Sequence, residues 1–81
     1  MTKSYHTNNT ALAAFLAVSS IKLIKLNVST KPAEFIFESH NGTIDRLVFD
    51  WESGLAECNV VSFYKAYKSF VSQIVGAGNG Q

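Results

Sequence analysis

The stretch that most constrains this chain runs from Val60 to Ile74, where apolar side chains recur every three or four residues. That spacing is the period of one helix face and not of a strand. The apolar positions are Val60, Phe63, Tyr64, Tyr67, Phe70, Val71 and Ile74. Asn59 stands where it can cap the start of a helix, and Gly76 stands where it can end one. Because several of these side chains are aromatic, the rest of the chain must offer them a large apolar surface.

The composition is that of a folded protein. A chain of 81 residues with 47% apolar and 16% charged residues predicts one globular domain. We expect residues 1–81 to form this domain, with an ordered core at about 7–75 and a flexible tail at 76–81. The net charge of +1 is too small to draw the whole domain onto nucleic acid or an anionic membrane. A single cysteine excludes an internal disulfide, so we expect the chain in the cytoplasm.

An apolar run near the N-terminus, residues 11–18, has two interpretations. It resembles a short signal peptide, but Asn8 and other polar residues directly precede it. An amphipathic helix is favoured, because Leu12, Phe15 and Leu16 form one apolar face. Cleavage of this segment as a signal peptide would remove one side of a small hydrophobic core. No run in the sequence approaches the ~20 apolar residues of a membrane span.

Two alternating segments, 21–28 and 33–38, predict β-strands joined by a turn at 29–32. Paired as an antiparallel hairpin, they align apolar residues on one face: Leu26 with Phe35, and Ile24 with Phe37. That face suits the aromatic helix near the C-terminus. We therefore expect the last helix to bury three aromatic side chains against Phe35 and Phe37, namely Phe63, Tyr67 and Phe70.

A further helix is predicted between the hairpin and the last helix. Its apolar face consists of Ile44, Leu47, Val48 and Trp51, and Gly54 follows as a stop. The element order is then α-β-β-α-α. The predicted fold class is α+β, a single small domain in which an antiparallel β-hairpin packs on helices.

Several short motifs carry a family resemblance that covers residues 5 to 75. They are Thr7, Leu12-Ala-Ala-Phe-Leu16, Ile21-Lys-Leu23, Phe35-Ile-Phe-Glu38, Trp51-Glu-Ser-Gly54 and Phe63-Tyr-Lys65. In these motifs the chain resembles a family of small domains of unknown function from bacteria and their mobile elements. The resemblance implies a helix-hairpin-helix-helix domain in the cytoplasm. It implies no functional residue, because the family has no assigned activity.

Few side chains in the sequence suggest catalysis or the binding of a metal or phosphate. Cys58 with His6 or His40 lacks the spacing of a zinc site, and we expect Cys58 to be a partly buried apolar residue. Asp45 and Glu52 share a helix face, where solvated charge is the usual role. The glycines at 76–80 follow a helix, whereas a phosphate-binding loop precedes one. We therefore expect no catalytic, metal or cofactor site and no small-molecule substrate.

Three classes of function remain. The first is a non-catalytic interaction module, self-associating as a homodimer or binding another protein, in a bacterial or phage protein system. The alternative is a nucleic-acid accessory domain that uses four lysines: Lys22, Lys25, Lys65 and Lys68. An enzyme ranks last because catalytic groups are sparse.

The hairpin is the expected site of self-association. A two-stranded sheet leaves both outer edges unpaired, so two copies joined edge to edge would form a four-stranded sheet with two-fold symmetry. The predicted register also leaves an apolar second face. The residues expected to make the contact are Ile21, Leu23, Lys25 and Ile36.

Overall fold

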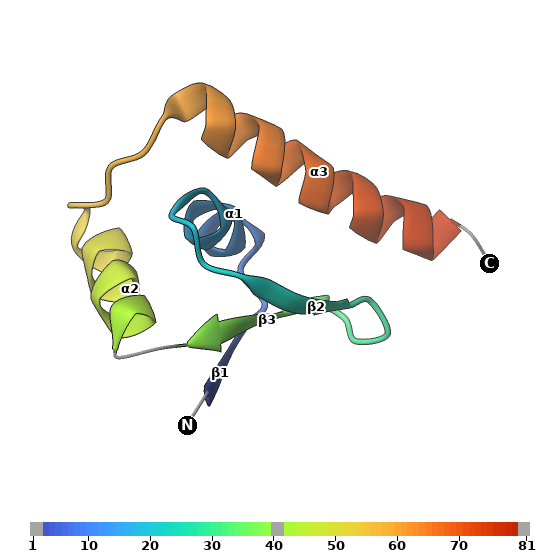
Figure 1. Cartoon of the computed structure of the whole chain (residues 1–81). Helices are drawn as coiled ribbons and strands as arrows, with labels where there is room; N and C mark the ends of the chain where they lie inside the picture. The colour runs from blue at the N-terminus through green and yellow to red at the C-terminus, as the bar shows by residue number, and fades with distance from the viewer. Residues whose placement is uncertain (1–2, 40–41, 80–81) are drawn as a thin grey trace.

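A computed structural model describes residues 3–39 and 42–79 (Figure 1). Its elements, in chain order, are β1 Lys3–Thr7, α1 Thr10–Val18, β2 Leu23–Asn27, β3 Glu34–Ser39, α2 Thr43–Ser53 and α3 Val60–Asn79. The predicted α+β class is confirmed, with the β2–β3 hairpin packed on helices. The predicted order lacks β1, which precedes the first helix.

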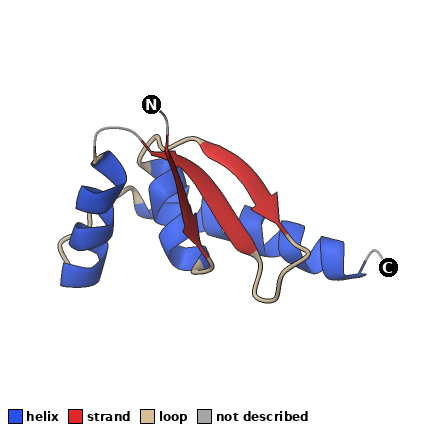
Figure 2. Ribbon diagram, turned by 90° about the horizontal axis from the view of Figure 1, so that it is seen from below, coloured by secondary structure: helices blue, strands red, loops and turns tan. Residues whose placement is uncertain are grey.

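The sheet is antiparallel, with strand order β1-β3-β2. Tyr5 and Thr7 of β1 lie opposite Phe37 and Phe35, so these four side chains share one face. Both phenylalanines are fully buried there. Figure 2 shows α1 and α3 behind this sheet on one side, whereas α2 stands beside it. We call the face covered by these two helices the inner face and the opposite one the outer face.

The register of β2 confirms half of the predicted pairing. Leu26 lies opposite Phe35 as expected, but Leu23, and not Ile24, lies opposite Phe37. A bulge between Leu23 and Lys25 produces this shift and leaves Ile24 exposed. Because a bulge adds one residue to one strand, the side chains on either side of it change faces relative to a regular alternation.

The centre of the core is α1. The Asn9 side chain caps it, since the Leu12 backbone N–H donates to Asn9 Oδ1 at 3.1 Å. Five consecutive residues, 12–16, are buried. A helix buried all round needs close neighbours, and here α3 and β1 pack against it, with α2 at its side. The predicted helix is therefore confirmed, but its surroundings are more apolar than a surface helix requires.

Helix α2 follows its predicted pattern. Ile44 is fully buried, and Leu47, Val48 and Trp51 pack against the core. Gly54 ends the helix with φ of 78°, a left-handed conformation that glycine adopts without the penalty of a Cβ. The ring of Trp51 lies 5.5 Å from that of Phe15, which ties α2 to the core helix.

Helix α3 matches its prediction in part. The Ser62 backbone N–H donates to Asn59 Oδ1 at 2.9 Å, which confirms the cap. Phe70 is buried, with its ring centroid 5.0 Å from that of Phe35. The prediction that Tyr67 is buried is wrong, because its side chain faces solvent. The helix also continues past the predicted stop at Gly76 to Asn79.

Candidate functional site

The exposed face of α3 is the strongest candidate for a functional surface. Five apolar side chains on it point away from the core, at spacings of four, three, four and four residues. Their exposed fractions are 77% for Val60, 58% for Tyr64, 38% for Tyr67, 37% for Val71 and 51% for Val75. We call these five residues the apolar stripe. Contiguous apolar surface on one helix face is typical of an interaction site.

The stripe exists because the apolar arc of α3 is wider than its contact with the core. The residues that pack inward are Phe63, Ala66, Phe70 and Ile74. With 3.6 residues per turn, the stripe lies about a quarter turn around the helix from these residues. The sheet and α1 cover the inward residues and leave the neighbouring arc uncovered.

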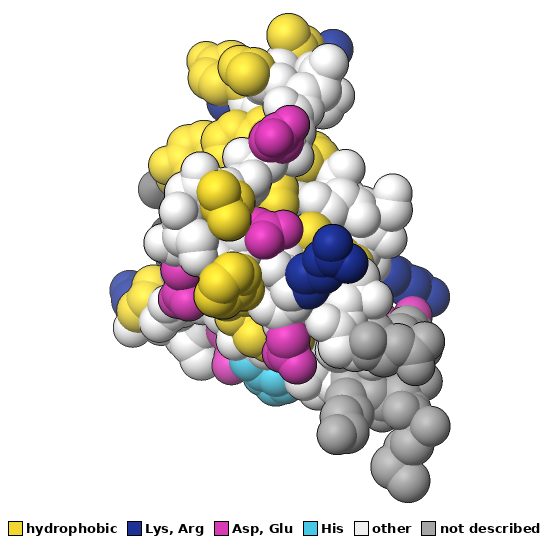
Figure 3. All heavy atoms as spheres, turned by 90° about the vertical axis from the view of Figure 1, so that its left-hand side faces the viewer, with side chains coloured by type: hydrophobic (Ala, Val, Ile, Leu, Met, Phe, Trp, Pro, Cys, Tyr) yellow, Lys and Arg dark blue, Asp and Glu magenta, His cyan; other side chains and the backbone are white. Residues whose placement is uncertain are grey.

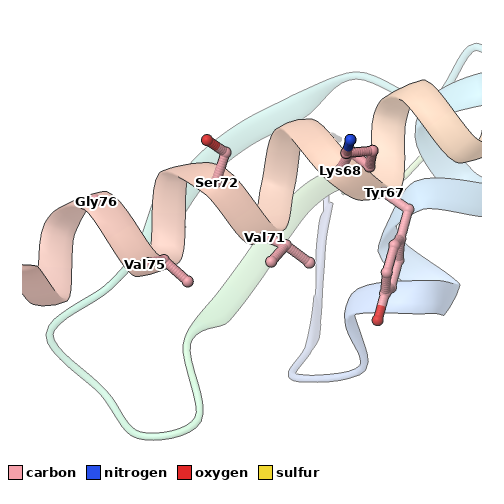
Figure 4. A pocket seen from close by; sticks show the side chains of 6 residues that line it. All are labelled: Tyr67, Lys68, Val71, Ser72, Val75 and Gly76. Carbon is pink, nitrogen blue, oxygen red and sulfur yellow. The ribbon is translucent and has the colours of Figure 1, made fainter.

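A shallow groove follows the stripe toward the C-terminus. Figure 4 shows Tyr67, Val71 and Val75 extending from the same side of the helix, with Lys68 and Ser72 above them. Gly76 completes the lining, and a side chain built there would meet no atom within 4 Å. An open apolar groove of this kind suits a protein surface better than a small molecule, which needs an enclosing cavity.

A cation borders the stripe. The Lys68 amino nitrogen lies 5.5 Å from the centroid of the Tyr64 ring, within the range of a cation–π contact. This contact holds the lysine stem along the apolar face while its charge stays in solvent.

The four residues predicted to form the interaction surface do not lie together. Ile21 and Leu23 pack against the core, so their placement on an outer apolar face is wrong. Lys25 and Ile36 do lie opposite each other on the outer face. The predicted placement of Leu23 fails because the bulge beside it directs the Leu23 side chain inward and Ile24 outward.

For the predicted edge-to-edge dimer, the structure leaves the edge of β2 as the available edge of the hairpin. Strand β1 pairs with β3, so the hairpin is part of a three-stranded sheet and one of its two edges is already filled. The outer edge of β2 carries the bulge, and bulges disrupt the regular ladder that another strand would need.

The lysines of the nucleic-acid alternative lie on different surfaces. Lys25 is on the outer face of the sheet, whereas Lys65 and Lys68 are on α3, which covers the inner face. Lys22 borders a separate hollow that it shares with Glu38 and Thr43. Phosphate binding by a duplex or single strand requires cations gathered along one face.

A polar network on the outer face was missed at the sequence level. Because the Glu34 carboxylate only accepts, His6 Nδ1–H donates to its Oε2 at 3.0 Å, and the Ser4 hydroxyl lies 3.1 Å from His6 Nε2. The order Ser–His–Glu is that of a nucleophilic triad. However, the side chains of His6 and Glu34 are 48% and 35% exposed, so water competes for these bonds. The network links β1 to β3; its one sequence signal is the two-residue spacing of Ser4 and His6.

The other chemical candidates are dispersed. Cys58 is exposed, so its predicted partial burial is wrong: the link between α2 and α3 runs over the surface, and Ala56 is its one residue packed on the core. His40 lies outside the described residues. Within 3–39 and 42–79, no three His, Cys, Asp or Glu side chains gather as metal ligands.

Asp45 and Glu52 of α2 act on a neighbouring tyrosine. Burial raises the pKa of Tyr5 above its usual value, and the negative charges of Glu52 and then Asp45 add to the increase. Both carboxylates are exposed, without the water-poor surroundings that general acid–base catalysis uses. Their effect is to extend the pH range over which the Tyr5 phenol stays neutral.

The side of the molecule formed by α2 differs from the stripe. Figure 3 shows apolar patches there that acidic side chains interrupt. Two of the exposed apolar residues of this region are Phe49 and Leu55, and four carboxylates lie between positions 45 and 57. Apolar residues separated in this way are ordinary on protein surfaces.

Comparisons with known proteins identify a family that the chain matches. A family model described as a domain of unknown function (DUF5659) matches residues 2–76, a segment that includes the whole apolar stripe. No curated protein and no solved structure matches the chain. Over the part of the chain that the structure describes, no helix is long and apolar enough to cross a membrane.

Proposed function

This chain belongs to the DUF5659 family of domains of unknown function, as its motifs predicted, and we propose that it is a non-catalytic interaction module that self-associates through the apolar stripe of α3. The observation that carries this proposal is the stripe itself. Its five side chains are between 37% and 77% exposed although all are apolar or aromatic. A second copy is the occupant that we propose, because it presents an apolar stripe of the same length and chemistry.

The residues of the stripe favour binding over simple solubility. Tyr64 and Tyr67 are large, rigid and amphipathic, and tyrosine is enriched among the residues that dominate binding energy. Burying them removes apolar area from water without ordering a long flexible chain. Lys68 supplies a polar rim beside them.

The choice of α3 over the sheet edge rests on what each surface offers. The stripe is apolar along four turns of a regular helix, whereas the β2 edge has a bulge and an exposed Lys25. A lysine and a bulge on an edge strand are features that prevent strand pairing. The self-association proposed from the sequence therefore moves from the hairpin to α3.

The compartment and origin are part of the proposal. We place the module in the cytoplasm, supported by a single cysteine that is free and exposed. The family resemblance supports a role in a bacterial or phage protein system.

The test is the molar mass in solution across a concentration series, by sedimentation equilibrium. The parent is expected to be dimeric at high micromolar concentration, and Val71→Asp monomeric, because a carboxylate in an apolar contact loses its hydration. A matched control, Ser69→Asp, adds the same charge on the solvated face of α3 and should remain dimeric. A monomeric parent refutes the proposal, and a dimer that survives Val71→Asp moves the contact elsewhere.

A further inference from the structure

The positions of the apolar stripe and its bordering lysine are symmetrical about the middle of the helix, although only the outermost pair consists of identical residues. From the outside inward, the matching positions are Val60 with Val75, Tyr64 with Val71, and Tyr67 with Lys68. Each pair is centred on the midpoint between Tyr67 and Lys68. At about 100° of rotation per residue, the two members of each pair also lie at equal angles on either side of the central line of the stripe.

A stripe spaced in this way keeps its positions in line when it faces its own reversed copy. We infer that two molecules pair α3 against α3 in antiparallel direction, about a two-fold axis that passes between Tyr67 and Lys68. The inference rests on the proposed function and adds the direction and register of the contact. Val60 of one copy then meets Val75 of the other, and Tyr64 meets Val71.

Side-chain size favours the antiparallel direction. In it, each Tyr64 packs against a smaller Val71, so large and small side chains alternate across the contact. A parallel pair would place Tyr64 against Tyr64 and Val71 against Val71. The helix dipoles also oppose each other in the antiparallel pair, which is the favourable arrangement of two adjacent helices.

The centre of the contact has two different flanks. The two copies of Tyr67 meet on the flank nearer the protein core, and the two copies of Lys68 lie on the solvent flank. Each Lys68 amino group already lies over a Tyr64 ring at 5.5 Å and can remain in water. Screening of the two like charges should make the dimer slightly stronger at higher salt, which distinguishes it from an ion-paired contact.

The available area fits a reversible dimer. Exposed fractions of 37% to 77% on three valines and two tyrosines correspond to roughly 500 Å² per copy, or about 1,000 Å² for the pair. Stable specific interfaces begin near about 1,000–1,200 Å². An interface at this lower limit is typical of weak, reversible association, so the test extends to high micromolar concentration.

Disulfide cross-linking tests the direction. In a Cys58→Ser background, Val60→Cys and Val75→Cys are made as separate proteins and oxidised alone or mixed. Positions 60 and 75 are about 22 Å apart along a helix, and a disulfide needs Cβ atoms within about 4.5 Å. The antiparallel pair predicts fast cross-linking in the mixture and little in either protein alone. A second pair, Tyr64→Cys with Val71→Cys, should also cross-link faster mixed than alone.

Sedimentation under reducing conditions first checks that the cysteine variants are dimers. Fast cross-linking of Val60→Cys alone shows a parallel pair and overturns the inference, while self-association through the stripe stands. Slow cross-linking of both mixtures overturns this register in the same way. If the parent is monomeric at high micromolar concentration, both the inference and the proposed function fail.

Discussion

Helices α1 and α3 differ in where their apolar side chains lie: those of α1 are buried, whereas many of those of α3 are exposed. In nine residues, α1 has five consecutive buried positions, 12–16. Over residues 60–76, the part of α3 whose burial is described, one position is fully in the core, Phe70, and a stripe remains exposed. The shorter helix is the centre of the fold, although the longer one has the more regular apolar pattern.

The difference shows what decides burial in a domain of this size. Small side chains at Ala13 and Ala14 let α1 approach its neighbours closely, so all its faces find contacts. The tyrosines and valines of α3 exceed the inner surface that α1 and the sheet can offer. The excess remains on the outside, where it is available to a second molecule.

The largest effect that tests this comparison is expected in α1. Phe15→Ala should lower the free energy of unfolding by about 3–5 kcal/mol, because it opens a cavity beside Trp51. Chemical denaturation measures the change. The matched control is Phe49→Ala, where the side chain is 64% exposed and the expected change is within about 0.5 kcal/mol. Equal losses for the two variants would contradict the assignment of the core.

A smaller effect is expected at the two helix caps. Asn9→Ala should cost about 1 kcal/mol of global stability, because it removes the cap of a buried helix. Asn59→Ala removes an equivalent bond from α3, but the first turn of α3 is exposed and can fray by itself. We expect its global cost, measured in the same denaturation experiment, to be less than half as large. A cost at Asn59 equal to that at Asn9 would mean that the start of α3 is integral to the core.

Much of the fold followed from the sequence because local patterns and packing agreed. The periods of 12–16 and 44–51 and the stop at Gly54 each specify one structure. Strand β1 was not predicted, because Tyr5 is its one large apolar residue. Its strand conformation depends on pairing with β3, about thirty residues away in sequence, and local propensity contains no information on such pairing.

The register error at Ile24 has a different cause. Positions 21, 23, 24 and 26 are all apolar, so the odd and the even alternation both present an apolar face. A bulge lets the strand use both, with Leu23 and Leu26 inward. When a sequence is compatible with two registers, its apolar pattern does not predict the residue at which the strand changes from one to the other.

The stripe was recognised as a pattern but assigned to the wrong surroundings. Val60, Tyr64, Tyr67 and Val71 belong to the same periodic set as Phe63 and Phe70. Periodicity reveals that an arc of the helix is apolar, but the part that is buried depends on how much surface the other elements provide. For α3 the arc is wider than that surface.

Amide hydrogen exchange at low and high protein concentration tests the central claim most directly, because it locates any contact that forms on association. We predict that amides of 60–75 gain protection as the concentration rises, because local opening of α3 must then break the dimer. Amides of 12–16 lie in the core and open only with the whole domain, so they should gain no more than the stability that dimer formation adds to the domain. Protection gained in β2, Leu23–Asn27, with none in α3, would restore strand pairing as the contact and contradict the account.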